Sequence, residues 1–174
     1  EAAALPLAAL TAWQVLVETA RLKKGQKVFI QAGSGGVGNL AIQLAKHLGA
    51  FVATSTSTGN VPWVKALGAD VVIDYKQQDF SSALQDYDVV LNSLGADELE
   101  KSLKILKPGG QLISISGPPT PQFAQAQGFS WPLRLITGLL SSGIRRKARR
   151  KGVSYAFVFM RASGPQLREI ATLV

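Results

Sequence analysis

Gln31-Ala32-Gly33-Ser34-Gly35-Gly36-Val37-Gly38 is the stretch that decides the fold of this chain. It continues a run of strand-forming residues that begins at Lys27, which predicts a strand over 27–32. After the glycines, apolar residues recur at helical spacing from Val37 to Leu48. A glycine-rich turn between a strand and a helix is the setting of the G-x-G-x-x-G dinucleotide-binding fingerprint.

Each glycine of the fingerprint has its own expected role. Gly33 allows a tight turn, Gly35 lets the backbone approach a pyrophosphate, and Gly38 lets the helix pack against the strand. The first amides of the helix and the helix dipole would receive the anion. The alternative is a tight turn with a structural role alone.

The same alternation of strands and helices continues along the chain. Strands are expected at 51–54, 71–74, 88–92 and 111–116, and helices at 7–20, 61–67, 81–85 and 96–106, with a turn at 107–110. Strands that are continuous apolar runs between helices indicate a parallel sheet covered on both faces. We therefore predict one α/β domain over 1–174, a doubly wound Rossmann-type fold with a leading helix in 1–20 and its core at 27–117.

A helical and basic insertion, residues 118–152, interrupts this core before its last strand. We expect a loop at 118–127, a helix at 131–144 and the basic run from Arg145 to Lys151. A final strand at 153–160 and a helix follow, with Ser163 and Gln166 at capping-box spacing.

Composition excludes several kinds of chemistry. The 174 residues contain no cysteine and one histidine, His47, so disulfides, thiolate sites and a histidine metal cluster are not expected. No apolar run reaches the roughly 18 residues that span a bilayer, and no signal peptide is evident. We expect a cytoplasmic protein. The start at Glu1 and the end at Val174 within an amphipathic pattern suggest one domain of a longer protein.

The end of the second expected strand and the residues after it, Ala53-Thr54-Ser55-Thr56-Ser57-Thr58-Gly59-Asn60, contain no carboxylate. NAD enzymes of this fold place Asp or Glu there to accept hydrogen bonds from the ribose 2′-hydroxyl. Hydroxyls and an amide can instead donate to a 2′-phosphate. We predict NADP(H) as the cofactor; the alternative is that these residues only end a strand and cap a helix.

Several stretches together resemble the medium-chain dehydrogenase/reductase superfamily, in its zinc-independent, quinone-oxidoreductase-like branch. They are Leu5-Pro6-Leu7 with Leu10-Thr11-Ala12-Trp13, Gln31 to Gly38, Leu67-Gly68-Ala69-Asp70 with Ile73-Asp74-Tyr75, and Lys107-Pro108-Gly109-Gly110. The ending from Tyr155 to Val174 is similar to the reticulon-interacting mitochondrial members.

This resemblance implies an enzyme that transfers hydride from NADPH to a quinone or an α,β-unsaturated carbonyl. It places the pyrophosphate on Ser34, Gly35, Gly36 and Val37, the 2′-phosphate near Thr56, Ser57 and Asn60, the adenosine near Tyr75, and the nicotinamide ribose near Asn92, Ser93 and Leu94, with Thr11 facing an interdomain cleft. Asn60 stands where some relatives have a lysine. No catalytic or metal-binding residue is assigned, and a GroES-like domain that shapes the substrate pocket would precede Glu1.

Other functions are open at this point. The chain could be a non-catalytic NADPH sensor or interaction module. The basic run could be a solvated helix end, or it could join the apolar residues of 131–144 as a contact with an anionic membrane, although such segments more often pack on their own domain or on a sister subunit. We expect no nucleic-acid binding, because aromatic residues do not interleave the run. The strand at 153–160 would leave an apolar edge, and we predict a homodimer through it.

Overall fold

A computed structural model describes residues 5–173, so residues 1–4 of the expected leading segment and Val174 lie outside the described part. Six parallel strands form one sheet in the order β3-β2-β1-β4-β5-β6. Their bounds are β1 Lys27–Ile30, β2 Phe51–Thr56, β3 Val71–Asp74, β4 Tyr87–Asn92, β5 Leu106–Ser114 and β6 Ser154–Phe157. The predicted doubly wound Rossmann-type sheet is confirmed.

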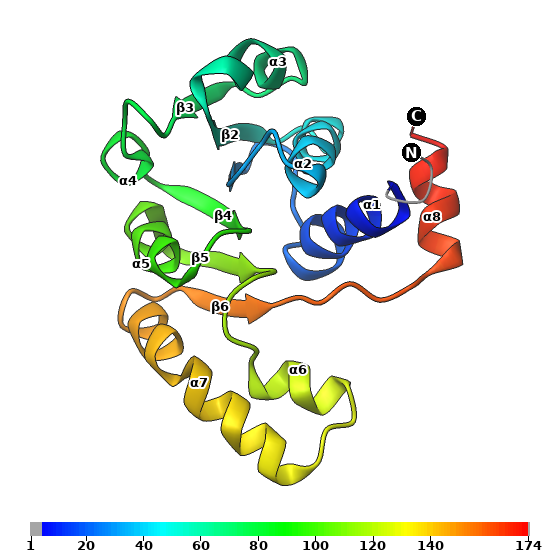
Figure 1. The fold of residues 1–174 in the computed structure, drawn as a ribbon, viewed down its shortest axis with the longest axis vertical. Helices are drawn as coiled ribbons and strands as arrows, with labels where there is room; N and C mark the ends of the chain where they lie inside the picture. The colour runs from blue at the N-terminus through cyan, green and yellow to red at the C-terminus, as the bar shows by residue number, and fades with distance from the viewer. Residues whose placement is uncertain (1–4, 174) are drawn as a thin grey trace.

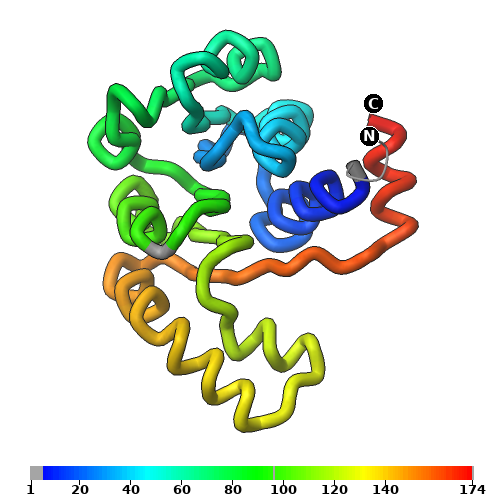
Figure 2. The backbone as a smooth tube through the Cα atoms, in the orientation of Figure 1, coloured from blue at the N-terminus to red at the C-terminus, as the bar shows by residue number. Residues whose placement is uncertain are grey.

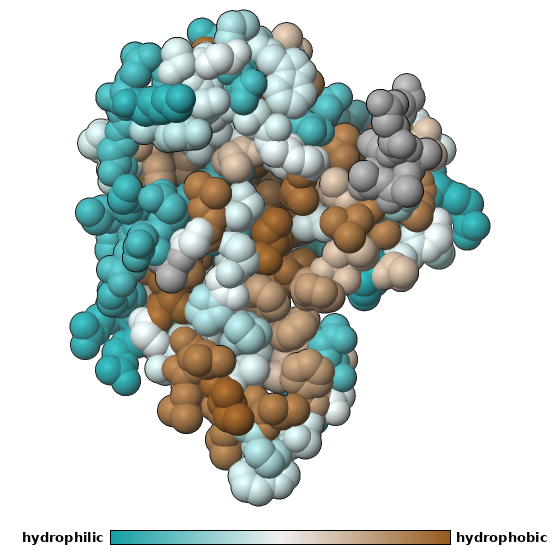
Figure 3. Space-filling model, in the orientation of Figure 1, coloured by the Kyte–Doolittle hydropathy of each residue, from teal (hydrophilic) through white to brown (hydrophobic). Residues whose placement is uncertain are grey.

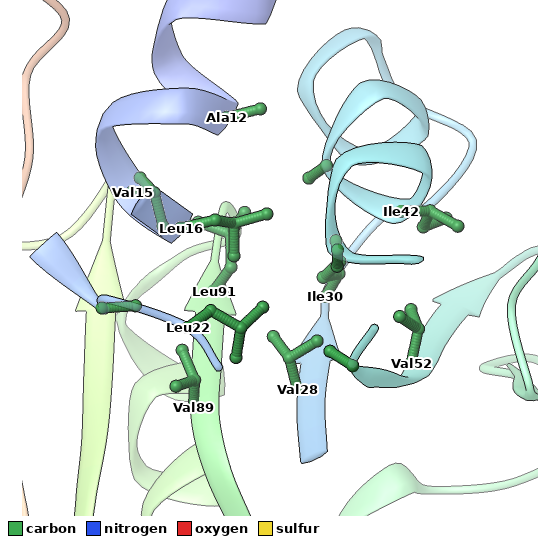
Figure 4. Close-up of a cluster of buried hydrophobic side chains, with 14 of the residues drawn as sticks. Ala12, Val15, Leu16, Leu22, Val28, Ile30, Ile42, Val52, Val89 and Leu91 are labelled. Atoms are coloured by element: carbon green, nitrogen blue, oxygen red, sulfur yellow. The ribbon is translucent and has the colours of Figure 1, made fainter. Parts of the chain in front are cut away.

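Helices cover both faces of the sheet because alternate side chains of each buried strand point to opposite faces (Figure 1). Val28 and Ile30 lie in one core cluster, whereas Phe29 between them lies in the other. The first cluster is closed by α1 (Leu5–Trp13), the π-helical turn η1 (Gln14–Thr19), α2 (Gly36–His47) and α3 (Val61–Ala66). Figure 4 shows Val15, Leu16 and Ile42 packed over β1, β2 and β4 in this layer.

The second cluster is closed by α4 (Phe80–Ala83), α5 (Ala96–Ile105) and the carboxyl end of α7 (Trp131–Arg150). Phe29 stacks in a tilted arrangement on Phe80, with ring centroids 4.7 Å apart. Ile144 and Ala148 of α7 also belong to this cluster. The basic run therefore continues a helix that is anchored to the domain.

The insertion differs from its prediction. Residues 118–127 were expected to be a loop, but α6 (Pro121–Ala126) forms there, with the Thr120 hydroxyl accepting a hydrogen bond from the Phe123 amide at 3.2 Å. A capping threonine followed by proline is a helix-start signal. Helix α7 also extends six residues beyond the predicted end, to Arg150. The two helices form a hairpin that projects from the domain (Figure 1).

The last two strands also depart from their predicted bounds. β5 starts at Leu106, and residues 107–110 bulge out of it, because Tyr87 pairs with Leu106 while Val89 pairs with Gln111. β6 ends at Phe157, short of the expected residue 160. An extended segment then leads to α8 (Gly164–Ala171), whose amide at Gln166 donates to the Ser163 hydroxyl.

The two ends of the described chain lie side by side, with α8 against α1 (Figure 2). The Gln14 side chain connects them: its Nε2 atom donates to the Arg161 carbonyl and to Gln166 Oε1, each at 2.8 Å. Thr11 does not face a cleft in this structure, because it is buried and its hydroxyl donates to the Leu7 carbonyl at 2.7 Å. Within residues 5–173 we find no helix long and apolar enough to cross a membrane.

Candidate functional site

The amino end of α2 is the centre of the candidate site. Gly35 precedes the helix in an extended conformation, and no side chain caps it. The first hydrogen bond of the helix runs from the Asn39 amide to the Gly35 carbonyl at 3.0 Å. The amides of Gly36, Val37 and Gly38 precede that bond, so they point out of the helix end together with its positive dipole. This arrangement suits an anion such as a pyrophosphate.

Two fingerprint glycines are required by close packing. A Cβ atom on Gly38 would lie 2.2 Å from the Ala32 carbonyl oxygen, which confirms that Gly38 lets α2 approach β1. A Cβ atom on Gly33 would lie 2.2 Å from Thr54 Oγ1. Gly33 lies in the tight turn that the Gly35 amide closes on the Ala32 carbonyl at 2.9 Å, while the residue with left-handed backbone is Ala32, at φ 52°. Gly33 is needed for contact with β2.

The end of β2 lies against the glycine loop. The buried Thr56 hydroxyl donates to Ser34 Oγ at 2.9 Å, so it joins the glycine loop to the end of β2. The turn η2 (Thr58–Asn60) follows, and Asn60 Nδ2 donates to Ser57 Oγ at 3.2 Å. The structure therefore brings together Ser57 and Asn60, two of the three residues expected near a 2′-phosphate.

One carboxylate near this turn was missed by the sequence analysis. Asp74 ends β3 beside Thr56, its partner in the sheet register. A hydrogen bond from the Thr58 hydroxyl is the largest influence on the Asp74 pKa, which lies below its usual value with further help from the Lys76 amide and the Gln77 side chain. Asp74 is thus ionised at neutral pH. The spacing along β2 could not reveal it, because sheet pairing supplies it from another strand.

A cavity of about 680 Å³ opens beside the glycine loop, at the carboxyl edge of the sheet. Five predicted residues line it: Ser34, Gly35, Thr56, Tyr75 and Leu94. Most of the opposite wall was not predicted; it comes from the segment after β3 and from α5: Lys76, Gln77, Gln78, Asp79, Phe80, Glu98 and Lys101. Only the position of these residues after a strand could have indicated them, because segments that follow parallel strands meet at this edge of the sheet.

Cations and carboxylates on this wall are paired with one another. Lys101 Nζ lies 3.2 Å from Asp79 Oδ2 and 3.2 Å from Glu98 Oε1. Hydrogen bonds from the Ser81 amide and from Lys101 outweigh partial burial and hold the Asp79 pKa below its usual value, and the two carboxylates raise the Lys101 pKa. Tyr75 stands at the rim with 61% of its surface exposed. The wall combines an aromatic ring with hydrogen-bonding groups.

The predicted contact of Asn92 with a ligand is not available to its side chain. Asn92 is fully buried, its amide donates to Gln31 Oε1 at 2.6 Å, and its Oδ1 accepts from the Ser114 hydroxyl at 2.6 Å. Gln31 Nε2 donates to the buried Ser102 hydroxyl at 3.3 Å. This network joins β1, β4, β5 and α5 where the strand order reverses. Asn92 therefore has a structural role at the end of β4.

Ser93 and Leu94 follow Asn92 out of β4. The Ser93 hydroxyl donates to the Gln31 carbonyl at 3.2 Å, and Leu94 is partly exposed at the cavity. Across the described residues, no group of three or more His, Cys, Asp or Glu side chains could hold a metal ion. Zinc independence stays a prediction, as does the cytoplasmic location.

Three comparisons relate the chain to known proteins. Residues 67–174 match the family described as zinc-binding dehydrogenase. The chain is 44% identical over 123 residues to a 2-methylene-furan-3-one reductase of Solanum lycopersicum, covering 70% of this chain and 31% of that protein. It is 35% identical over its full length to the mitochondrial NAD(P)H oxidoreductase RTN4IP1 of Danio rerio, covering 47% of that protein.

Among solved structures, a quinone oxidoreductase from Coxiella burnetii superposes over 100% of this chain and 48% of its own, with a TM-score of 0.81 and 32% identity. The chain thus spans about half, or less, of the length of these relatives. The expected resemblance is confirmed by both sequence and fold. The chain belongs to the zinc-binding dehydrogenase family of the medium-chain dehydrogenase/reductase superfamily.

Proposed function

We propose that this chain binds NADP(H) at the carboxyl edge of its sheet. The observation that supports it best is the uncapped amino end of α2, whose outward amides adjoin a cavity and a turn of hydroxyl and amide groups. Relatives include an NADPH-dependent alkenal/one oxidoreductase of Arabidopsis thaliana, 40% identical over 123 residues, which favours the phosphorylated dinucleotide.

The residues present fit such a ligand. The amides of Gly36, Val37 and Gly38 would hold the pyrophosphate, and Gly35, which lacks a side chain, would let it approach. Ser57 and Asn60 would donate to the 2′-phosphate, and Tyr75 would lie along the adenosine. The negative charge of Asp74 opposes the 2′-phosphate, so we infer a moderate preference for NADPH.

The bound dinucleotide would supply a hydride from its nicotinamide ring. The chain's part is to orient that ring at the strand ends after Asn92, where the buried network with Gln31 and Ser114 fixes the backbone. We propose a quinone or an α,β-unsaturated carbonyl as the hydride acceptor, since relatives are named as reductases of both kinds. A GroES-like domain that completes the substrate pocket is part of this proposal.

The pyrophosphate site is tested by calorimetric titration of the chain with NADPH and NADH. A Cβ atom at Gly35 would lie 3.2 Å from the Ala32 carbonyl oxygen, a contact that small shifts can relieve. Gly35→Asp and Gly35→Asn therefore fit equally, but only the first adds a negative charge at the helix end. We expect Gly35→Asp to abolish measurable binding and Gly35→Asn to weaken it less. Equal binding by the wild-type chain and Gly35→Asp would refute the site.

The choice between NADPH and NADH is tested at the turn after β2. We expect the wild-type chain to bind NADPH at least about tenfold more tightly than NADH, a difference of about 1.4 kcal/mol. Ser57→Asp should remove that preference while leaving NADH binding unchanged, with Ser57→Asn as the uncharged control. Asp74→Asn should strengthen NADPH binding about threefold, because it removes an opposing charge. No change in the NADPH to NADH ratio in either charge variant would contradict the assignment.

A further inference from the structure

In its amino-terminal half, helix α7 buries a face of small and polar residues and exposes its large apolar side chains. Thr137 and Ser141 are buried, and a Cβ atom on Gly138 would lie 3.4 Å from Pro121 of α6. Their hydroxyls are satisfied within the helix, by the carbonyls of Arg134 and Thr137. Of the two packings expected for this stretch, on its own domain or on a sister subunit, the first is found for Ile144 but not for apolar side chains such as Trp131 and Leu139, which are exposed.

The exposed apolar side chains form one surface, which we call the hairpin tip. Trp131 and Leu139 expose 73% and 74% of their surfaces, and the other members are also exposed: Phe129, Leu133, Leu135, Ile136 and Leu140. Figure 3 shows apolar residues gathered over the projecting hairpin. Contiguous apolar patches on a protein surface mark interaction sites.

The positive charge of the protein is concentrated in the same insertion. The insertion, residues 118–152, contains seven of the 19 Lys and Arg residues and none of the 11 Asp and Glu residues, so the rest of the chain has 12 basic and 11 acidic residues. Arg146 and Arg150 are exposed and lie seven and 11 positions after Leu139, on the same side of the helix. The exposed face of α7 is thus apolar at its amino end and basic at its carboxyl end.

We propose that the α6–α7 hairpin docks on an anionic lipid bilayer. The tip enters the boundary between headgroups and acyl chains, and the basic end of α7 contacts the anionic headgroups. A second copy of the chain fits this surface poorly. In a two-fold interface, parallel α7 helices would bring basic ends together, and antiparallel ones would set basic ends against apolar tips. An anionic bilayer complements both halves at once.

The test is co-sedimentation of the chain with vesicles of phosphatidylcholine alone or mixed with phosphatidylglycerol. We expect binding only to the anionic vesicles and its loss at high salt. Arg146→Gln with Arg150→Gln should weaken binding about 25-fold, from about fivefold per side chain, the equivalent of about 1 kcal/mol each. The matched control neutralises two exposed lysines on other surfaces, Lys24→Gln with Lys65→Gln, and should bind as the wild type does.

The apolar half is tested separately with Leu135→Ser and Leu139→Ser combined. Both side chains are exposed, so we expect wild-type circular dichroism and melting temperature but at least about tenfold weaker vesicle binding. Insertion is read from fluorescence in chains that keep one tryptophan. Bromine-labelled lipid should quench Trp131 of the tip and should not quench Trp63, which lies on α3.

Two outcomes would overturn the proposal. One is equal sedimentation of the wild-type chain and the Leu135→Ser, Leu139→Ser variant with anionic vesicles, since the tip would then have no part in binding. The other is a wild-type chain that ignores vesicles but loses a dimer in light scattering when the tip is changed, which would assign the surface to a second copy.

Discussion

Replacing Gly38 by alanine should destabilise the domain. The added Cβ atom would lie 2.2 Å from the Ala32 carbonyl oxygen and 2.9 Å from Gly33 Cα, both backbone atoms, whereas ordinary contact begins at 3.4 Å. Helix α2 would therefore have to move roughly 1.2 Å away from the loop, judged from those two distances. Overpacking of this kind lowers the free energy of unfolding by up to about 3 kcal/mol. The better helix propensity of alanine raises it by about 1 kcal/mol. We expect a net loss of about 2 kcal/mol.

The assay is urea unfolding at equilibrium, followed by circular dichroism. Gly36→Ala is the matched control, because its Cβ atom would meet nothing within 4 Å and it lies in the first turn of the same helix. That variant should gain up to about 1 kcal/mol. The two free energies of unfolding should differ by about 3 kcal/mol, the sum of those two effects. Equal stability of the two variants would refute the packing argument.

Three further predictions concern the network, the strand starts and the sheet edge. Asn92→Ala should cost about 2–4 kcal/mol in urea unfolding, because it leaves Gln31 and Ser114 buried without their partner; a loss under about 1 kcal/mol would contradict that. Asp88 is partly buried, which opposes its ionisation, but hydrogen bonds from Lys107 and the Lys27 amide outweigh burial and lower its pKa. Its stabilisation is therefore present above the usual pKa of 3.8 and is lost as pH falls through the lowered value, so Asp88→Asn should cost about 1–2 kcal/mol at pH 7 and nothing in strong acid. Since β6 is an edge strand, light scattering should give twice the 18.5 kDa chain mass, and monomer at all concentrations would exclude the dimer.

Local patterns predicted the strands and helices of the core well. Strand-forming residues before the glycines identified β1, and apolar residues at helical spacing from Val37 onward identified α2. Both patterns are visible within one segment, because each element must bury one face of its own residues. The bulge at residues 107–110 shows the limit. The Pro-Gly-Gly turn was recognised, but only pairing with β4 reveals that the strand already begins at Leu106.

The insertion was predicted less well for two physical reasons. Proline and glutamine content indicated a loop, although Thr120 and Pro121 are start signals of α6. Apolar spacing in α7 favoured burial of residues such as Leu139, but Leu139 is exposed, whereas Ser141 is buried and Gly138 lies against Pro121 of α6. Which face a helix buries depends on its neighbour, and the sequence of the helix alone does not supply it.

The parts of the candidate site that come from one continuous segment were predicted. The parts that the sheet brings together from separate segments were not. The glycine loop and the turn at Ser57 and Asn60 lie together as expected. Asp74 arrives through pairing of β3 with β2, and Gln31 is joined to Asn92 across the reversal of strand order. Such contacts link residues distant in sequence, so spacing along the chain does not predict them.

The most direct test of the account is the backbone amide spectrum of the isotope-labelled chain during titration with NADPH. The amides of Gly36, Val37 and Gly38 should shift most with either nucleotide, because the helix end receives the pyrophosphate that both share. The amide and side chain of Asn60 should shift with NADPH and stay in place with NADH. Shifts confined to other surfaces, or none at saturating NADPH, would contradict the central claim that the amino end of α2 is the nucleotide site.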